Sequence, residues 1–201
     1  MAEIAPFAGL RVDERLAGPL DRAICPPYDV ISEADRDALL ARGEHNLVRV
    51  EGWRDAPTEP VRYRAAAETL RAWRASGALR ADPVPALYLY EQRFRLAGAE
   101  HRRRGVLCAL RLYDESAGVV LPHERTFPKA KADRLELLRA TRANVSPIFG
   151  LVEDRARAIE RAFAAVASSP PAAEARVADE RHRLWVETDA SRVSALASTL
   201  G

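Results

Sequence analysis

The sequence predicts an α+β fold, a mixed sheet containing antiparallel hairpins and flanked by helices. Residues Leu87–Leu112 alternate apolar and polar side chains on both sides of a short turn, as paired antiparallel strands do. Residues Val61–Ala75 instead repeat apolar side chains every three or four positions, which is typical of an amphipathic helix. Hairpins and helices do not alternate regularly, and this favours α+β over a doubly wound parallel sheet.

The first half of the chain is predicted to hold short elements before that helix. Two adjacent prolines force an extended turn, because each fixes its own φ and restricts the preceding residue. Ser32 is a typical helix N-cap, and Asp35 stands at the acidic position of a capping box. The expected order is a strand at Phe7–Val12, a turn at Pro26–Asp29, a helix at Glu33–Ala41, a strand at Leu47–Val50 and the helix Val61–Ala75, which Gly77 ends.

After the first hairpin, the periodicity predicts three more helices and a second hairpin. In the first of these helices Leu135 and Leu138 are expected to face inward, and Asn144 suits its C-terminal cap. Asp189 is a suitable N-cap for the last helix. The expected order is a helix at Lys131–Ala143, a strand at Ile148–Val152, a helix at Arg155–Ala167, strands at Ala175–Ala178 and Arg181–Glu187, and a helix at Ser191–Leu200. A single domain over residues 1–201 is expected.

The composition is that of an ordinary globular chain. Its 201 residues are 48% apolar and 30% charged, enough to bury a substantial core. The net charge is +2, and the basic residues are interleaved with acidic ones, which makes nucleic acid an unlikely partner. The run Arg102-Arg103-Arg104 is the exception, and we interpret it as a solvated cluster at a hairpin edge.

Cysteine usage and hydropathy indicate a cytoplasmic protein. Cys25 and Cys108 are too few and too far apart for a disulfide framework or a metal knuckle, and both fit buried thiols. The amino terminus lacks the basic and apolar regions of a secretory signal. No stretch approaches the ~20 apolar residues that a spanning helix needs, so no membrane partner is expected.

The segment His123–Leu135 carries the most distinctive chemistry. It holds the only lysines, Lys129 and Lys131, and their presence indicates a need for compact ammonium groups rather than planar guanidinium groups. An irregular loop at 122–130 would lead into a helix N-terminus, whose free N–H groups favour an anion. Glu124 would then act as a base or hold magnesium. The expected phosphate ligands are His123, Arg125, Thr126, Lys129, Lys131 and Arg134. The alternative is a surface loop with solvated lysines.

Two other segments are weaker candidates. The turn Pro26–Val30 places Tyr28 beside Asp29, which would point into a ligand pocket and serve as a base or metal ligand. The alternative is a structural turn in which Asp29 bonds its own backbone. His45-Asn46 lies at a helix-to-strand junction, with Arg49 shortly after. A cap and a satisfied surface histidine explain this pattern as well as a ligand site does.

Three groups of residues together resemble the bacterial and archaeal family called domain of unknown function 1015. They are Pro26-Pro27-Tyr28-Asp29-Val30-Ile31, then His45-Asn46 with Arg49, then His123-Glu124-Arg125-Thr126 through Lys131–Leu135 and Ala143–Phe149. The resemblance spans nearly the whole chain in the right order. It adds Tyr28, Asn46, Arg49 and Asn144 to the candidate ligand-binding residues.

The chain departs from that family in two places. Pro128-Lys129-Ala130 stands where the family usually has a glycine-proline turn before its lysine, which implies a stiffer turn. The family's later Asp-Gly-His-His-Arg motif is absent, so we interpret the chain as an amino-terminal portion, with a second polypeptide as a candidate for the missing half. That motif loosely resembles the phosphate-binding Arg box of the ParB/sulfiredoxin superfamily, which includes nucleotide-dependent free serine kinases.

These observations support two hypotheses about function. The first is a phosphate- or nucleotide-binding, kinase-like small-molecule transferase module, incomplete in this chain, with a nucleotide and Mg²⁺ as the cofactors to test. The alternative is a non-catalytic nucleotide-sensing or protein-interaction module. DNA binding is disfavoured by the net charge and by the lack of a helix-turn-helix pattern.

Overall fold

A computed structural model describes residues 2–51, 59–166 and 168–200. The chain forms two compact units, which are described separately below. Unit 1 contains Met1–Gly9, Ala81–Pro122 and Phe149–Gly201, and unit 2 contains Leu10–Arg80 and His123–Ile148. Each unit is therefore built from segments that are far apart in the sequence.

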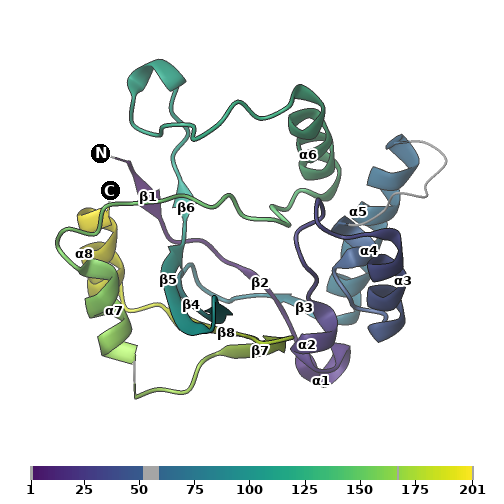
Figure 1. Ribbon diagram of the computed structural model, residues 1–201, viewed down its shortest axis with the longest axis horizontal. Helices are drawn as coiled ribbons and strands as arrows, with labels where there is room; N and C mark the ends of the chain where they lie inside the picture. The colour runs from purple at the N-terminus through teal and green to yellow at the C-terminus, as the bar shows by residue number, and fades with distance from the viewer. Residues whose placement is uncertain (1, 52–58, 167, 201) are drawn as a thin grey trace. The chain divides into compact units, whose positions relative to one another are not determined.

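Unit 1 is built on a four-stranded sheet with the order β5-β4-β8-β7. Its strands are β4 (Leu87–Leu96), β5 (Ala99–Leu107), β7 (Ala173–Val177) and β8 (Glu180–Glu187). The α+β class is confirmed, and β4 of the predicted hairpin occupies a central position (Figure 1). We expected a mixed sheet, but all three strand pairings here are antiparallel, because two hairpins join through their inner strands.

The first hairpin closes tightly and ends earlier than predicted. Ala97 and Gly98 both have positive φ, as the two central residues of a type I′ turn require. The return strand β5 stops at Leu107, and the chain then forms β6 (Ala109–Leu110), a two-residue strand that pairs with β1 (Ile4–Ala5). Leu112, which we placed in the hairpin, is exposed.

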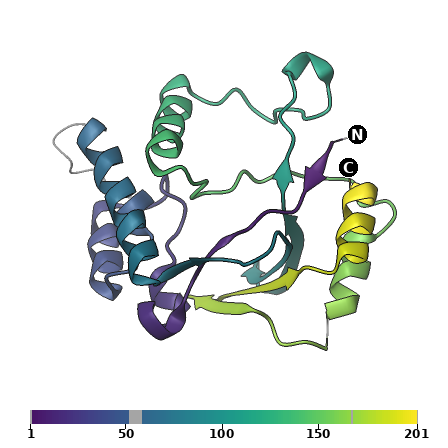
Figure 2. The ribbon, with the colours of Figure 1, turned by 180° about the vertical axis from the view of Figure 1, so that it is seen from behind.

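Two helices cover one face of the sheet in unit 1. They are α7 (Ala158–Val166) and α8 (Ala190–Leu200), which lie side by side in both views (Figures 1 and 2). Their apolar side chains pack with those of β4 and β8 in one buried cluster that includes Leu89, Phe163 and Trp185. This core ends where the charged residues of the same sheet face begin. A short 3₁₀ helix, η1 (Glu115–Ala117), lies in the connection after β6.

The predicted first strand, Phe7–Val12, is divided. Phe7 makes a single bridge to Ala86, and only Leu10–Val12 form a strand, β2. Between them Gly9 donates its N–H to the Tyr88 hydroxyl over 2.6 Å. A Cβ at Gly9 would lie 2.6 Å from the same oxygen, so the close approach requires glycine.

Unit 2 is mostly helical, with one short two-stranded sheet. Its strands are β2 and β3 (Leu79–Ala81), and its helices are α1 (Glu14–Ala17), α2 (Leu20–Ala23), α3 (Glu33–Arg42), α4 (Val48–Glu51), α5 (Glu59–Ser76) and α6 (Pro128–Thr141). The core between α4, α5 and α6 contains Val50, Leu70, Trp73 and Leu137. The capping box of α3 is confirmed, since Ser32 and Asp35 exchange side chain-to-backbone hydrogen bonds. Gly77 follows the end of α5 with φ of 80°.

The strand predicted at Leu47–Val50 is wrong, because this segment forms helix α4. A short apolar run fits either structure, and the preceding residue decides between them. The buried Asn46 side chain accepts a hydrogen bond from the Val48 N–H over 3.0 Å, as a helix cap does.

Helix α6 begins and ends earlier than predicted and faces differently. It runs from Pro128 to Thr141, and its C-cap is Arg142 rather than Asn144. Leu137 is its buried residue, whereas Leu135 and Leu138, which we expected to face inward, are exposed. Leu135, Leu137 and Leu138 lie within four positions of one another. Their spacing alone therefore does not decide which side of α6 faces the core.

The strand predicted at Ile148–Val152 is also wrong, because the segment is irregular and exposed. Helix α7 begins at Ala158, three residues later than predicted, and its expected end at Ala167 lies outside the described residues. The second hairpin and the last helix are confirmed as β7–β8 and α8, with Asp189 accepting a hydrogen bond from the Arg192 N–H.

Candidate functional site

The site in unit 2 is organised around Arg134 on α6. Its Nη1 donates to Oε2 of Glu51 over 2.5 Å, while Nε and Nη2 donate to Oδ2 of Asp133 over 2.9 and 2.6 Å. The centre of its guanidinium lies 3.8 Å from the ring centroid of Tyr28, within cation–π range. We call Tyr28, Glu51, Tyr63, Asp133, Arg134 and Ser146 the Arg134 cluster.

Glu51 is the buried member of the Arg134 cluster. It is the last residue of α4, and its side chain is only 2% exposed. Besides Arg134, it accepts a 2.5 Å hydrogen bond from the hydroxyl of Ser146. A buried carboxylate is costly unless it is paired and hydrogen-bonded, and here both conditions are met. Glu51 therefore connects α4, α6 and the segment after α6.

Asp133 connects the same cluster to α5. Its Oδ1 accepts a 2.9 Å hydrogen bond from the hydroxyl of Tyr63, and Arg62 forms an ion pair with the same oxygen. The guanidinium of Arg62 also lies 4.7 Å from the Tyr63 ring centroid. The first half of α6 is thus held to α5 by polar contacts as well as by the apolar core.

The cluster brings together residues from two of the three groups that carried the family resemblance, the first and the third. Tyr28 comes from the diproline turn, Arg134 from the segment after the lysines, and Ser146 from the segment after α6. We expected Arg134 to bind phosphate, but two carboxylates already occupy its donors. Glu51, Tyr63 and Ser146 were not among the predicted site residues. One feature of the sequence could have drawn attention to Glu51: this acidic residue directly follows the mostly apolar run Leu47–Val50.

The lysine segment leads into α6 as an exposed, irregular stretch up to Phe127. Pro128 is the first helical residue, no side chain caps the helix, and the first turn contains no acidic residue. Lys129 and Lys131 lie in that first turn and are exposed. Cations are disfavoured at this end of a helix, where the peptide dipoles are positive. An anion bound at the start of α6 would therefore be stabilised by the helix dipole and by the two lysines.

The other predicted residues of this segment lie on its surface. Glu124 accepts a 3.4 Å hydrogen bond from Thr126 and lies 3.9 Å from Nε2 of His123. Arg125 is exposed, and so is Asn144 beyond the end of α6. The loop before α6 therefore keeps its donors and the Glu124 carboxylate exposed.

The two weaker candidate segments are placed differently from each other. In the diproline turn, Tyr28 is half-buried against Arg134, while Asp29 is exposed. Asn46 is fully buried, and its amide donates to the carbonyls of Arg22 and Ile24 over 2.6 and 3.1 Å. With the bond from Val48, the Asn46 side chain is committed to holding backbone.

Arg49 lies on α4, and its Nη2 donates a long hydrogen bond to the carbonyl of Leu40 at 3.4 Å. Its Nε is buried and has no hydrogen-bond partner among the described residues. Arg49 is therefore only partly satisfied by the fold.

A groove of about 610 Å³ runs between α5 and α6. Tyr63 of the Arg134 cluster forms part of its wall, so the groove adjoins the cluster. Three arginines give it a positive lining that one glutamate, paired to Arg139 over 2.7 Å, partly offsets. The groove is lined by Pro60, Tyr63, Arg64, Ala67, Arg71, Glu136, Arg139 and Ala140.

The cysteines do not take part as nucleophiles. Burial, with the charge of Glu51 nearby, raises the pKa of the Cys25 thiol to about 12, and burial also raises the pKa of Cys108. Both thiols are therefore protonated at neutral pH and unreactive. Within the described ranges, no three His, Cys, Asp or Glu side chains converge to hold a metal ion.

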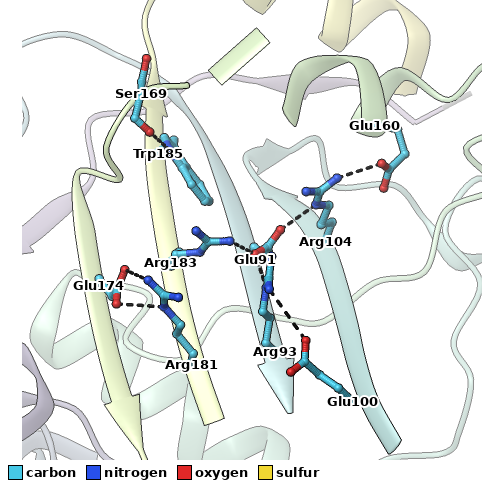
Figure 3. Close-up of polar contacts among 10 residues, drawn as sticks. All are labelled: Glu91, Arg93, Glu100, Arg104, Glu160, Ser169, Glu174, Arg181, Arg183 and Trp185. Carbon is cyan, nitrogen blue, oxygen red and sulfur yellow. Dashed lines mark hydrogen bonds and ion pairs between the residues drawn. The ribbon is translucent and has the colours of Figure 1, made fainter. Parts of the chain in front are cut away.

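Unit 1 contains a second charged cluster, centred on Glu91 of β4 (Figure 3). This carboxylate is 1% exposed and accepts hydrogen bonds from Arg183, from Arg104 over 2.8 Å and from Arg93 over 3.1 Å. Burial by itself would raise its pKa, but the three arginines outweigh burial and lower the pKa to about 2. Glu91 is therefore ionised at any physiological pH.

Strand register explains how the Glu91 cluster assembles. Arg104 on β5 and Arg183 on β8 are the residues directly opposite Glu91 on its two sides. Arg104 continues to Glu160 on α7 over 2.8 Å, and its guanidinium lies 4.6 Å from the Phe163 ring centroid. Arg104 thus links the Glu91 cluster to α7 at the border of the apolar core.

A family model described as "Protein of unknown function (DUF1015)" matches residues 4–201, and the chain belongs to this family. The resemblance seen in the sequence is thereby confirmed. No curated protein and no solved structure matches the chain. No described helix is both long enough and apolar enough to cross a membrane.

Proposed function

We propose that the chain binds a phosphate-bearing small molecule or a nucleotide at the start of α6, as part of a kinase-like transferase module. The observation that carries the proposal is the first turn of α6, which holds two lysines, no acidic residue and no side-chain cap. A bound phosphate would accept hydrogen bonds from the free N–H groups and offset the lysine charges.

The Arg134 cluster would hold this end of α6 in place. Arg134 and Asp133 lie about one turn after the lysines and are tied to α4 and α5 through Glu51 and Tyr63. Phosphoryl transfer depends mostly on positioning and electrostatic stabilisation, so a rigid base for the lysines is a functional asset. Arg134 is then a positioning residue rather than a phosphate ligand.

The groove between α5 and α6 would take the rest of the ligand. Arg64, Arg71 and Arg139 line it, and these cations suit a second anionic group or a carboxylate. Its volume of about 610 Å³ is within the range of small-molecule sites.

Glu124 and Asp29 are the carboxylates proposed for proton transfer or Mg²⁺. Magnesium in nucleotide sites is bound through one or two carboxylates and the substrate phosphates, so few protein ligands are needed. Asp133 and Glu51 are already paired with arginines, whereas Glu124 and Asp29 are exposed. In this proposal Glu124 or Asp29 would be a ligand of a magnesium ion that arrives with its nucleotide.

A thermal-shift screen tests the proposal. The full chain is heated with pyrophosphate, nucleotides and phosphorylated metabolites, each with and without Mg²⁺. A ligand at ~100 times its dissociation constant should add ~2.7 kcal/mol to the free energy of unfolding. Stabilisation by none of these anions would reject the proposal.

The alternative, a nucleotide-sensing or protein-interaction module without catalysis, is favoured by a different feature. Ile148, Phe149, Leu151 and Val152 are all more than half exposed. Contiguous exposed apolar residues mark interaction sites, and a second polypeptide is the proposed partner.

We also propose a cytoplasmic location, which rests on the two unpaired cysteines.

A further inference from the structure

The charged face of the sheet in unit 1 is not used by the proposed function. We define the arginine face as Arg93, Arg102, Arg104, Arg176, Arg181 and Arg183. Ion pairs place four of these side chains on the Glu91 side of the sheet (Figure 3). Arg102 and Arg176 lie on the same side of the sheet, because side chains two residues apart on a strand share a side. Arg102 is two residues from Arg104, and Arg176 is two residues from Glu174.

Four of the arginines form a row across all four strands. Arg102 lies opposite Arg93, Arg93 lies opposite Arg181, and Arg181 lies opposite Arg176. Strands are about 4.8 Å apart, so the row spans roughly 14 Å. Like charges directly opposite one another disfavour strand pairing. A bound anion would relieve this repulsion.

The acids on this face compensate the arginines only in part. Arg93 contacts Glu91 and Glu100, and Arg181 makes two hydrogen bonds to Glu174 over 2.9 and 2.8 Å. Glu160, which contacts Arg104, is the fourth carboxylate found on these arginines within the described residues. Arg102 and Arg176, at the two ends of the row, are exposed.

Glu91 orients the arginines more than it neutralises them. It accepts hydrogen bonds from three guanidinium groups, although one carboxylate balances only one charge. The Nε of Arg183 is buried and has no hydrogen-bond partner among the described residues. The cluster therefore contains more guanidinium donors than its own acceptors satisfy among the described residues.

We infer that the arginine face binds a compact polyphosphate. Guanidinium groups bind phosphate oxygens, and the exposed Arg102 and Arg176 at the ends of a row of roughly 14 Å, with the remaining donors of Arg93 and Arg181 between them, match a dense anion. Single-stranded nucleic acid needs exposed aromatic rings for base stacking, but Trp185 and Phe163 beside this face are buried. An acidic peptide carries its charge less densely. This site lies in unit 1 and is separate from the lysine segment of unit 2.

Calorimetric titration of the full chain with sodium tripolyphosphate tests the inference. The background variant Lys129→Ala/Lys131→Ala removes the proposed site in unit 2. In that background, Arg102→Gln/Arg176→Gln should weaken tripolyphosphate binding at least tenfold, since it removes both ends of the row. The matched control Arg42→Gln/Arg74→Gln changes two exposed arginines of unit 2 and should leave affinity unchanged. Unaltered melting curves verify that each variant is folded.

Three outcomes would overturn the inference. One is loss of all tripolyphosphate binding in the lysine background, which would leave the proposed function intact. A second is equal affinity for the Arg102/Arg176 variant and the Arg42/Arg74 control. The third is tighter binding of a single-stranded oligonucleotide or a polyglutamate peptide than of tripolyphosphate at the same ionic strength. The Arg102→Gln/Arg176→Gln variant can also be titrated in a chain that keeps both lysines. If that protein binds tripolyphosphate at one site fewer than the natural chain, both proposals are supported.

Discussion

Arg134 and Glu51 are 83 residues apart in the sequence, and a 2.5 Å hydrogen bond joins Nη1 of the first to Oε2 of the second. The bond pairs a half-buried cation with a buried anion. It connects α6, which carries the lysines, to Glu51 of α4, which was not among the predicted site residues.

Replacement of Arg134 by alanine should strongly destabilise unit 2. Among the described residues, the change leaves the buried Glu51 carboxylate with the Ser146 hydroxyl as its remaining hydrogen-bond donor, and breaking a buried ion pair typically costs about 3–5 kcal/mol. Urea unfolding measures the loss. Arg139→Ala on the same helix, where the ion pair is exposed, should cost less than about 1 kcal/mol. Equal losses for the two variants would contradict the role assigned to Glu51.

Lys131→Ala should weaken pyrophosphate binding by about 1.5–3 kcal/mol, the range for a lost charged hydrogen bond. Lys131→Arg should restore binding only in part, because a planar fork cannot take the place of a compact ammonium. Calorimetry gives the affinities, with Arg74→Ala on α5 as the control. If all four proteins bind pyrophosphate equally, Lys131 is a solvated surface charge.

Acid should destabilise unit 1 through Glu91. Its pKa is about 2 in the folded chain, below the ordinary 4.5 of a glutamate carboxyl, so its contribution to stability is fully present above pH 4.5 and is lost as the pH falls toward 2. The difference corresponds to at most about 3 kcal/mol. Urea unfolding at pH 3 and pH 6 should therefore show a larger fall for the natural chain than for Glu91→Gln. The exposed Glu68→Gln should behave like the natural chain.

Exposed apolar residues should cause the chain to self-associate or to bind a hydrophobic dye. Such exposed residues lie at Ile148–Val152, whereas Trp185 is buried. Leu151→Ser should reduce both association in sedimentation and dye fluorescence, since Leu151 is 91% exposed. Val84→Ser, at an isolated exposed position, is the control. A monomer at high concentration with no dye binding would refute this expectation.

Local signals predicted the fold well where a few neighbouring residues decide the structure. Ser32 and Asp35 cap α3 through contacts three residues apart, and the alternation in Leu87–Leu96 defines β4. The short run Leu47–Val50 has no such internal evidence, and the Asn46 cap decides its conformation. Ile148–Val152 has the composition of a strand but makes no strand pairing in the described chain.

The candidate site was predictable only in part, because its contacts are long-range. The lysines stand out in the sequence, and the structure places them at a helix start. The bonds from Glu51 to Arg134 and from Tyr63 to Asp133 span 83 and 70 residues. No periodicity encodes such pairs, so Arg134 was assigned to a ligand although its donors serve the protein. The arginine row has the same origin, since strand register, not sequence proximity, aligns Arg93 with Arg181.

The contact between Gly9 and Tyr88 constrains how the chain can evolve. The Tyr88 hydroxyl lies where a Cβ at position 9 would be, and it also donates to Asp82 over 2.7 Å. Alanine at position 9 would displace this hydroxyl from both partners. Across related chains, glycine at position 9 should therefore be inherited together with tyrosine at position 88. Lineages that have phenylalanine at position 88 should be the ones in which larger residues first appear at position 9.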